Sequence, residues 1–278
     1  MYHLLKPDSM IIPERFKNGQ NQIISVINSF DTIPLYKMSK VGLMNRIDTK
    51  YVFSLEILPA LLNKLRAKYQ VMEINQDRIF PYVTTYLDTK DFLFFIQHMT
   101  GKLERHKIRY RKYELSGVSY LEIKKKTNKL RTEKVRMVNR FDPVGFDDRA
   151  SCFIAANTPY ECDSLKPQIT NTFTRTTLVN LDSNERITFD FDLTFSDQTG
   201  KIVKLPFISV AELKRESLTN KSSFVSVVKE FGIRPTGFSK YCIGSQLIRE
   251  MPKRNLLKPK LMLINKLENE YNRSVGIR

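Results

Sequence analysis

The chain is poor in the residues that build disulfide frameworks and histidine-rich metal centres. Its 278 residues include three cysteines and three histidines, all widely spaced. They are Cys152, Cys162, Cys242, His3, His98 and His106. This spacing excludes a disulfide framework, a CxxC metal site and a histidine cluster, and it favours reduced thiols in a cytosolic protein.

Long apolar segments and the common signatures of nucleotide chemistry are also missing. No apolar run approaches the ~20 residues of a membrane span, and residues 1–17 lack the apolar stretch of a secretory signal. The sequence contains no GxxxxGKS or GxxxxGKT, no GxGxxG after a strand and no HExxH. Three histidines without a GxSxG motif disfavour a nucleophilic triad.

Internal repeats, low-complexity segments and linkers are absent as well, which favours one main domain. We place this domain at residues 21–251, after an N-terminal arm at residues 1–20 and before a basic C-terminal tail at residues 252–278. Solvated cations are expected in the tail at Lys253, Arg254, Lys258 and Lys260. The predicted location of the protein is cytoplasmic.

Positive charge is the strongest signal in what the chain does contain. It has 46 Lys and Arg against 29 Asp and Glu, a net charge of +17, and 41% of its residues are hydrophobic, as in a folded protein. Such a charge favours an anionic partner: nucleic acid, a membrane surface or a phosphate-rich small molecule. Residues 102–140 alone hold 14 Lys and Arg against 4 Asp and Glu, a net charge of +10.

This basic segment contains three runs in which charged and apolar residues alternate. The charged positions are Arg105, Lys107, Arg109 and Arg111 in the first run, Glu122, Lys124 and Lys126 in the second, and Lys134 and Arg136 in the third. A period of two predicts strands with one charged and one apolar face. Because like charges on neighbouring strands repel, the pattern makes sense if a polyanion lies between them.

The same alternation returns at residues 44–53, 186–193 and 207–215, for a total of about eight strands. At least five predicted helices have apolar stripes to bury. If the apolar strand faces pack against these helices, closing the sheet turns the charged faces inward. We therefore predict an α+β fold: an eight-stranded antiparallel β-barrel tunnel with a polar, basic interior and helices packed outside.

Four carboxylates fall among the cations of these charged faces: Asp48, Glu122, Asp190 and Glu212. Taken singly, each is better explained as a neutralising partner in a salt-bridge lattice. The alternative is that one or two of them bind a divalent ion that bridges phosphate oxygens, since Mg²⁺ or Mn²⁺ needs few carboxylates when phosphate and water complete its shell. Without such an ion, a carboxylate that faces phosphate would repel it.

Eight short stretches add a more specific signal through their order along the chain. They are Arg46-x-Asp48-x-Lys50-Tyr51, Tyr86-Leu87-Asp88-Thr89, Arg109-Tyr110-Arg111-x-Tyr113, Glu122-Ile123-Lys124-x-Lys126, Lys134-x-Arg136, Arg186-x-Thr188-x-Asp190, Glu212-Leu213-Lys214 and Ser239-Lys240-Tyr241. Together, from Met44 to Arg249, they resemble the VTC domain, the polyphosphate-polymerase branch of the CYTH or triphosphate tunnel metalloenzymes. That family has the eight-stranded antiparallel tunnel fold.

The resemblance implies a role for each matching position. The catalytic residues that hold triphosphate or polyphosphate oxygens would be Lys50, Arg109, Arg111, Lys124, Lys134, Arg175, Arg186 and Lys240. Further substrate contacts would come from Ser239, Lys126, Arg136 and Lys214. Glu212 would be the principal ligand of Mn²⁺ or Mg²⁺, with Glu122 and Asp190 as candidate second ligands.

The activity implied by the resemblance is transfer of the ATP γ-phosphate to a growing polyphosphate chain. Two alternatives stay open: a triphosphatase on the same fold, and a non-catalytic module that binds a polyanion or nucleic acid. Arg46 and Asp48 replace the two acids that open the superfamily's Glu-x-Glu-x-Lys motif, which fits the polymerase branch better than the hydrolases. Phe173 stands where the family leads us to expect a tyrosine.

The expected partners are ATP and inorganic polyphosphate. Nucleic acid is not expected, because Tyr110, Phe189 and Phe191 have the opposite strand parity from the cations, whereas single-strand binders place both on one face. No transmembrane segment is expected either. The resemblance is compatible with a membrane-protein partner that exports the polyphosphate.

Overall fold

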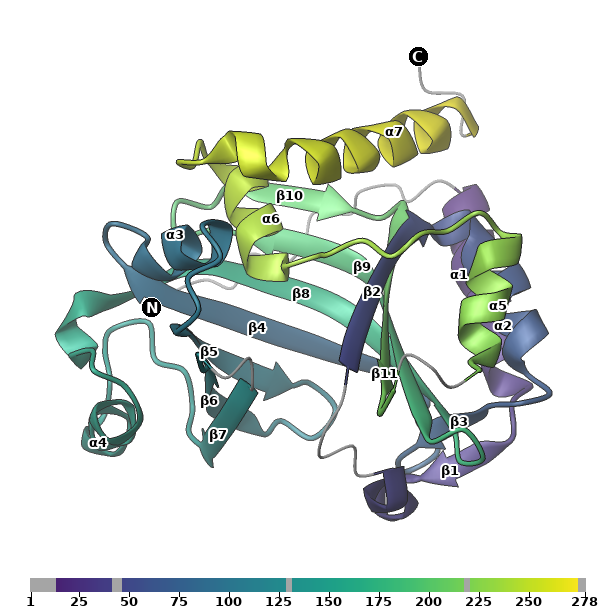
Figure 1. Cartoon of the computed structure of the whole chain (residues 1–278), viewed down its shortest axis with the longest axis horizontal. Coiled ribbons are helices and arrows are strands. Elements are labelled where there is room, and N and C mark those ends of the chain that lie inside the picture. Colours follow the sequence, from purple (N-terminus) through teal and green to yellow (C-terminus); the bar gives the residue numbers. More distant parts are fainter. Residues whose placement is uncertain (1–13, 42–46, 129–131, 218–220, 275–278) are drawn as a thin grey trace.

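A strongly curved β-sheet forms the centre of the computed structural model, which describes residues 14–41, 47–128, 132–217 and 221–274. Eight strands follow one another in the order β2-β11-β9-β8-β4-β5-β6-β7 (Figure 1), and every neighbouring pair is antiparallel. Their bounds are Ile47–Ser54 (β2), Phe80–Thr89 (β4), Arg105–Tyr113 (β5), Ser119–Lys126 (β6), Thr132–Val138 (β7), Leu165–Asn180 (β8), Glu185–Ser196 (β9) and Ile208–Arg215 (β11).

Three short strands complete the 11-stranded sheet. They are β1 (Thr32–Pro34), β3 (Gln70–Glu73) and β10 (Ile202–Leu205). Strand β10 pairs with β9, and β3 pairs with β8 and, in parallel, with β1.

The sheet is open, so the predicted closed barrel needs correction. Within the described residues no pairing joins the two ends of the eight-strand path, β2 and β7. Closure requires the end strands to come within the roughly 4.8 Å of a hydrogen-bonded pair. Alternation in the sequence predicts which face of a strand is charged, but it carries no information on how far the sheet curls.

Helices pack on both faces of the sheet, in three groups (Figure 1). Their bounds are Glu14–Asn28 (α1), Leu58–Leu65 (α2), Leu93–Met99 (α3), Asp148–Asn157 (α4), Ser223–Glu230 (α5), Lys240–Ile248 (α6) and Lys258–Ser274 (α7). Helices α1, α2 and α5 pack on β9 and β11, and α4 packs on β5 and β6. Helix α6 packs on β8 and β9, on the face that also carries Lys50 and Asp190, and α7 lies against β2. Each fully buried Leu or Phe in these clusters contributes about 1.5–3 kcal/mol.

Polar side chains fix where the predicted helices begin. Asp147 and Ser239 cap α4 and α6 by accepting from the backbone N–H groups of Ala150 and Cys242. The fully buried Asp88 accepts hydrogen bonds from the first turn of α3 and from the Tyr241 hydroxyl of α6, the latter at 2.6 Å. These bonds connect both helices to the end of β4.

Helices lie in both segments that flank the main domain. Helix α1 begins at Glu14, so the last part of the expected arm is helical. Helix α7 lies in the expected tail, and its Ile264 and Leu267 are buried because they face the core at helical spacing. Lys253, Arg254 and Lys258 are exposed as expected, whereas Lys260 is half-buried. In the part of the chain that the structure describes, no helix has the length and apolar character that a membrane crossing requires.

Candidate active site

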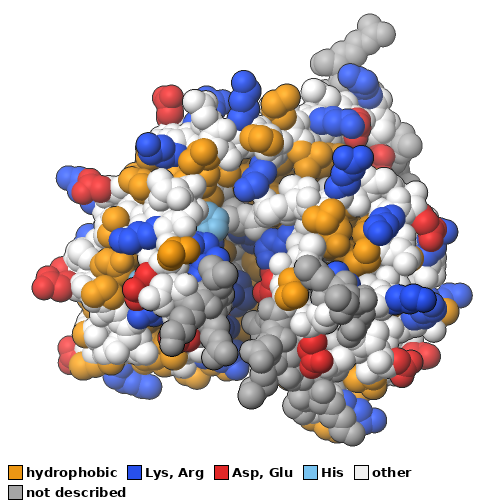
Figure 2. Space-filling model, viewed as in Figure 1, with side chains coloured by type: hydrophobic (Ala, Val, Ile, Leu, Met, Phe, Trp, Pro, Cys, Tyr) orange, Lys and Arg blue, Asp and Glu red, His pale blue; other side chains and the backbone are white. Residues whose placement is uncertain are grey.

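The concave face of the sheet gathers the charged residues into one channel. Cross-strand partners share a face, and the register places Lys50 beside Glu212 and Arg109 beside Glu122. Figure 2 shows this face hollowed near its centre, with lysine and arginine side chains in the hollow. We call the following set the basic channel: Lys50, Lys107, Arg109, Arg111, Glu122, Lys124, Lys134, Arg175, Arg186, Asp190, Glu212, Lys214, Ser239 and Lys240.

Glu212 on β11 is the centre of a first ionic cluster. Its carboxylate forms ion pairs with Lys50 of β2 and with Lys214, whose Nζ lies 2.5 Å from Glu212 Oε2. The same Nζ lies 2.9 Å from Asp48 Oδ2. Burial, and then the charges of Lys214 and Lys240, lower the pKa of Lys50 to about 7. A lysine in this channel can therefore change its charge near neutral pH.

The donor set of this cluster fits a divalent cation. Carboxylate oxygens of Asp48 and Glu212 converge on one positive group, the ammonium of Lys214. No three His, Cys, Asp or Glu side chains converge in the described residues, so phosphate and water would have to complete the shell. Mg²⁺ is commonly bound in that way, through one or two carboxylates and substrate phosphates.

Asp190 on β9 is the centre of a second cluster. Arg175 donates from Nε and Nη2 to its two carboxylate oxygens, and Lys240 at the start of α6 forms an ion pair with Oδ2. Burial alone would raise the pKa of Asp190, but Arg175 and Lys240 outweigh it and hold the pKa well below its usual range. The carboxylate therefore stays ionised and orients two cations toward the channel.

Glu122 on β6 is the centre of a third cluster and is fully buried. Arg109 donates to Oε2 from Nε at 2.8 Å and from Nη2 at 2.6 Å, and Lys134 of β7 pairs with Oε1. Burial opposes ionisation, yet Arg109, Arg111 and Lys134 lower the pKa of Glu122. In the described structure, the ion pairs of Glu122 and Asp190 involve no cation of the Glu212 cluster. Among these carboxylates, Asp48 is the one that shares a cation, Lys214, with Glu212.

Three channel cations have no carboxylate partner within the described ranges: Lys107, Arg111 and Lys124. Lys107 donates to Ser239 Oγ at 3.3 Å, and Arg111 Nε donates to Thr84 Oγ1 at 3.3 Å. Burial, followed by the charges of Arg109 and Arg111, lowers the pKa of Lys124 to about 6. Because these donors are not compensated, phosphate oxygens would gain most by binding them.

Aromatic rings beneath the cations were missed by the sequence reasoning. Tyr82 and Tyr86 of β4 lie on the channel face, with Arg111 5.7 Å and Arg109 5.9 Å from the respective ring centres. Phe173 stacks on Tyr82 at 5.3 Å. Both tyrosines and Phe173 are buried, so their faces support cations and are not open to nucleobases.

Other predicted residues lie where the strand parity places them. Tyr110, Phe189 and Phe191 belong to the helix-covered cores. Arg186 is paired in register with Lys214. Arg136 on the exposed strand β7 stacks over Tyr120 at 4.5 Å. Lys126 ends β6 opposite Arg105, and Arg46 lies outside the described residues.

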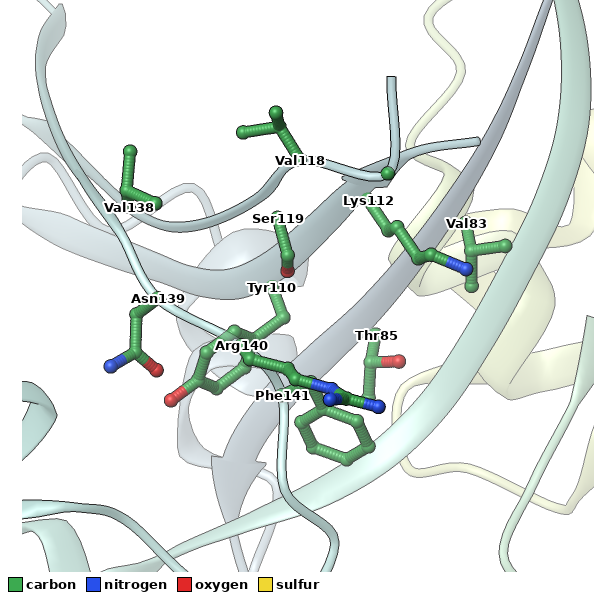
Figure 3. Close-up of a pocket in the computed structure, with 11 residues that line it drawn as sticks. Val83, Thr85, Tyr110, Lys112, Val118, Ser119, Val138, Asn139, Arg140 and Phe141 are labelled. Carbon is green, nitrogen blue, oxygen red and sulfur yellow. The ribbon is translucent and has the colours of Figure 1, made fainter. Parts of the chain in front are cut away.

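A separate cavity of about 540 Å³ lies on the opposite face of β4, β5 and β6 (Figure 3). Tyr110 and Thr85 point into it from the sheet, and Arg140 and Phe141 come from the segment that follows β7. None of its lining residues belongs to the basic channel. The basic channel therefore lies on a face of its own.

Comparison with known proteins identifies the family. The sequence profile of the VTC domain matches residues 45–144 and 156–249, more than half of the chain. The chain therefore belongs to the VTC domain family. Family and channel together support an enzyme with phosphoryl-transfer or triphosphatase activity. No curated protein sequence matches the chain.

Several solved structures resemble the fold at low identity. A proposed adenylate cyclase from Bacillus halodurans is 15% identical with a TM-score of 0.45, over 70% of this chain and 94% of that one. A proposed adenylyl cyclase from Hippeastrum, described as having a dominant triphosphatase activity, is 12% identical with a TM-score of 0.43, over 75% and 98%. The protein PH1819 from Pyrococcus horikoshii is 14% identical with a TM-score of 0.39, over 78% and 99%. These values are too low to transfer a function.

Proposed function

We propose that the protein is a metal-dependent polyphosphate polymerase that transfers the ATP γ-phosphate to the end of a polyphosphate chain inside the basic channel. The observation that supports this most is the row of cations along β5, in which Lys107 and Arg111 have no carboxylate partner among the described residues. A linear polyanion is the ligand that such a row fits. Membership of the VTC family supports the same reading.

The reaction needs no general base. The nucleophile is a terminal phosphate oxygen, which is already ionised at neutral pH. It forms a bond to the γ-phosphorus while the bond from that phosphorus to the β–γ bridging oxygen breaks, and the electron pair leaves with ADP. Alignment and charge neutralisation then account for catalysis, as is general for phosphoryl transfer.

The channel residues are suited to supply both the alignment of the reactants and the neutralisation of their charge. Arg109 and Arg175 are held in fixed orientation by the buried carboxylates Glu122 and Asp190, so little reorganisation accompanies phosphate binding. Glu212, with Asp48, would hold Mn²⁺ or Mg²⁺. Such an ion would neutralise part of the charge on the phosphate groups.

Hydrolysis on the same fold would require a positioned water and a carboxylate free to orient it. Glu122 and Asp190 each accept hydrogen bonds from two cations, which occupy both carboxylate oxygens. This arrangement favours a phosphate acceptor over water. It therefore supports the polymerase over the triphosphatase.

The test is incubation of the purified protein with ATP and Mn²⁺ or Mg²⁺, followed by a gel that resolves polyphosphate length. Long chains with stoichiometric ADP are expected, and both Glu212→Ala and Arg109→Ala should abolish them. Lys266→Ala, an exposed charge on α7, is the matched control. Orthophosphate without chains would indicate a triphosphatase, and no turnover would indicate a module that binds a polyanion.

A further inference from the structure

One end of the basic channel opens among cations that come from several separate elements. Arg105 and Lys126 face each other across β5 and β6, and Lys107 lies two residues further along β5. Lys260 of α7 places its Nζ against Gly237, two residues before Ser239, to which Lys107 donates. His98 on α3 lies among these groups, since α3 contacts both β5 and α6. We call Arg105, Lys107, Lys126 and Lys260, together with His98, the basic mouth.

The basic mouth contains no compensating acid in the described structure. Arg105 donates to a backbone carbonyl and Lys107 to a hydroxyl, and no ion pair neutralises Lys126 or Lys260. The nearby Glu104 is exposed and pairs with Lys125 instead. Burial and then Lys107, Arg105, Lys260 and Lys126 lower the pKa of His98 to about 3, with no carboxylate opposing them. Four like charges in one place repel unless an anion binds between them.

The mouth of the channel therefore differs in charge from the channel interior. Glu122, Asp190 and Glu212 lie in its interior, whereas the mouth is purely cationic. From Arg111 to Arg105 the cations of β5 extend over six residue-to-residue steps, roughly 20 Å at the rise of a strand. That row is longer than a triphosphate, so a short ligand held in the interior leaves the mouth free.

We propose that the basic mouth is a second binding site, for polyphosphate residues remote from the reacting end, so that the chain leaves the channel past Arg105, Lys126 and Lys260. This inference rests on the proposed function, which supplies the polyphosphate. Lys260 lies outside the two segments that match the VTC profile. Helix α7 thus adds a contact for the chain beyond the part that defines the family.

Equilibrium binding of triphosphate and of a long polyphosphate of defined length tests the mouth independently of turnover. The variants are Arg105→Ala, Lys260→Ala and their combination, with Lys266→Ala on the same helix as the matched control. Each single change should weaken long-chain binding several-fold and reduce the slope of log affinity against log salt by about 1. Triphosphate affinity should stay unchanged, and thermal unfolding verifies that the variants are folded.

Two outcomes would overturn the proposal. If the variants lose equal affinity for triphosphate and for long chains, Arg105 and Lys260 belong to the interior site. If they lose affinity for neither ligand, these two residues do not contact the bound polyphosphate chain. Failure of the proposed function can be distinguished from failure of this proposal. If the protein makes no chains from ATP, a selective loss of long-chain binding in the variants would still support the basic mouth as a polyphosphate-binding site. Wild-type protein that binds a long chain no more tightly than triphosphate would refute the mouth but leave the interior site intact.

Discussion

Arg175 holds Asp190 through two parallel hydrogen bonds, from Nε at 2.5 Å and from Nη2 at 2.7 Å. This fork joins β8 to β9 on the channel face and leaves the second oxygen of Asp190 shared with Lys240 of α6. The pair therefore connects the sheet, the helix that carries Ser239 and the predicted phosphate site.

Replacing Asp190 with asparagine should destabilise the ligand-free protein. Arg175 and Lys240 would remain buried without their shared charge, and breaking such a pair costs about 3–5 kcal/mol. Added triphosphate should recover more stability in Asp190→Asn than in the wild type, because its charge replaces the lost carboxylate. Urea unfolding with and without triphosphate measures both effects, and an equal ligand effect in the two proteins would contradict this account.

Proton uptake should accompany polyanion binding at pH 8. The pKa values of about 7 for Lys50 and about 6 for Lys124 leave both amines largely neutral in the empty channel at that pH, and nearby phosphate would raise the pKa values. Calorimetry in buffers of different ionisation enthalpy measures the uptake, and Lys124→Met should reduce it. Triphosphate binding without proton uptake at pH 8 would show that these lysines are already charged.

The free energy of unfolding of the ligand-free protein should increase with pH because of the same two lysines. Both lysines have folded-state pKa values below the ordinary 10.5, so the unfolded chain binds more protons between about pH 6 and 10.5. Their contribution to the free energy of unfolding therefore increases as the pH rises through this window and is constant below it. Urea titrations of the wild type and of Lys124→Met across this pH window isolate the pH-dependent contribution of Lys124 to the free energy of unfolding. This contribution should be absent in the variant.

Asp48→Asn should weaken the metal dependence without abolishing it. The amide keeps the shape of the side chain but removes one of the two charges that converge at Lys214. We expect roughly tenfold more Mn²⁺ for half-maximal activity, about 1.4 kcal/mol, whereas Glu212→Gln should lose activity at any metal concentration. Asp182→Asn, an exposed acid in the turn between β8 and β9, controls for charge. An unchanged metal titration in Asp48→Asn would exclude Asp48 as a ligand.

Asp88→Asn should reduce the stability of the protein without changing its affinity for triphosphate. The buried carboxylate accepts from the amides of Phe94 and Phe95 and from the Tyr241 hydroxyl, so the change should lower the free energy of unfolding by about 1.5–3 kcal/mol. Asp88 makes no ion pair with a channel cation in the described part of the chain, so the triphosphate affinity of the folded variant should stay near that of the wild type. A large loss of affinity at unchanged stability would give Asp88 a role in binding.

The local alternation of the sequence was sufficient to predict the strands and the charged faces on which the candidate site residues lie. Arg109, Glu122 and Lys124 fall on the charged parity, and the structure places them on the concave face of β5 and β6. Strand periodicity is a local property, so it can be read without knowing the fold. The helix starts at Asp147 and Ser239 could be predicted for the same reason, because a capping side chain bonds within its own first turn.

Only the tertiary structure decided which charges meet. Asp48 and Glu212 are far apart in the chain, yet they share Lys214 because β2 and β11 pair in one particular register. Tyr82 and Phe173 lie together under the cations because β4 and β8 pair in the register that places the two residues opposite each other. Packing between distant segments decides that the sheet stays open and that Lys260 approaches the channel. The periodicity of the sequence does not predict such packing. The sequence alone thus determined which residues face the channel, and long-range pairing determined which of them act together.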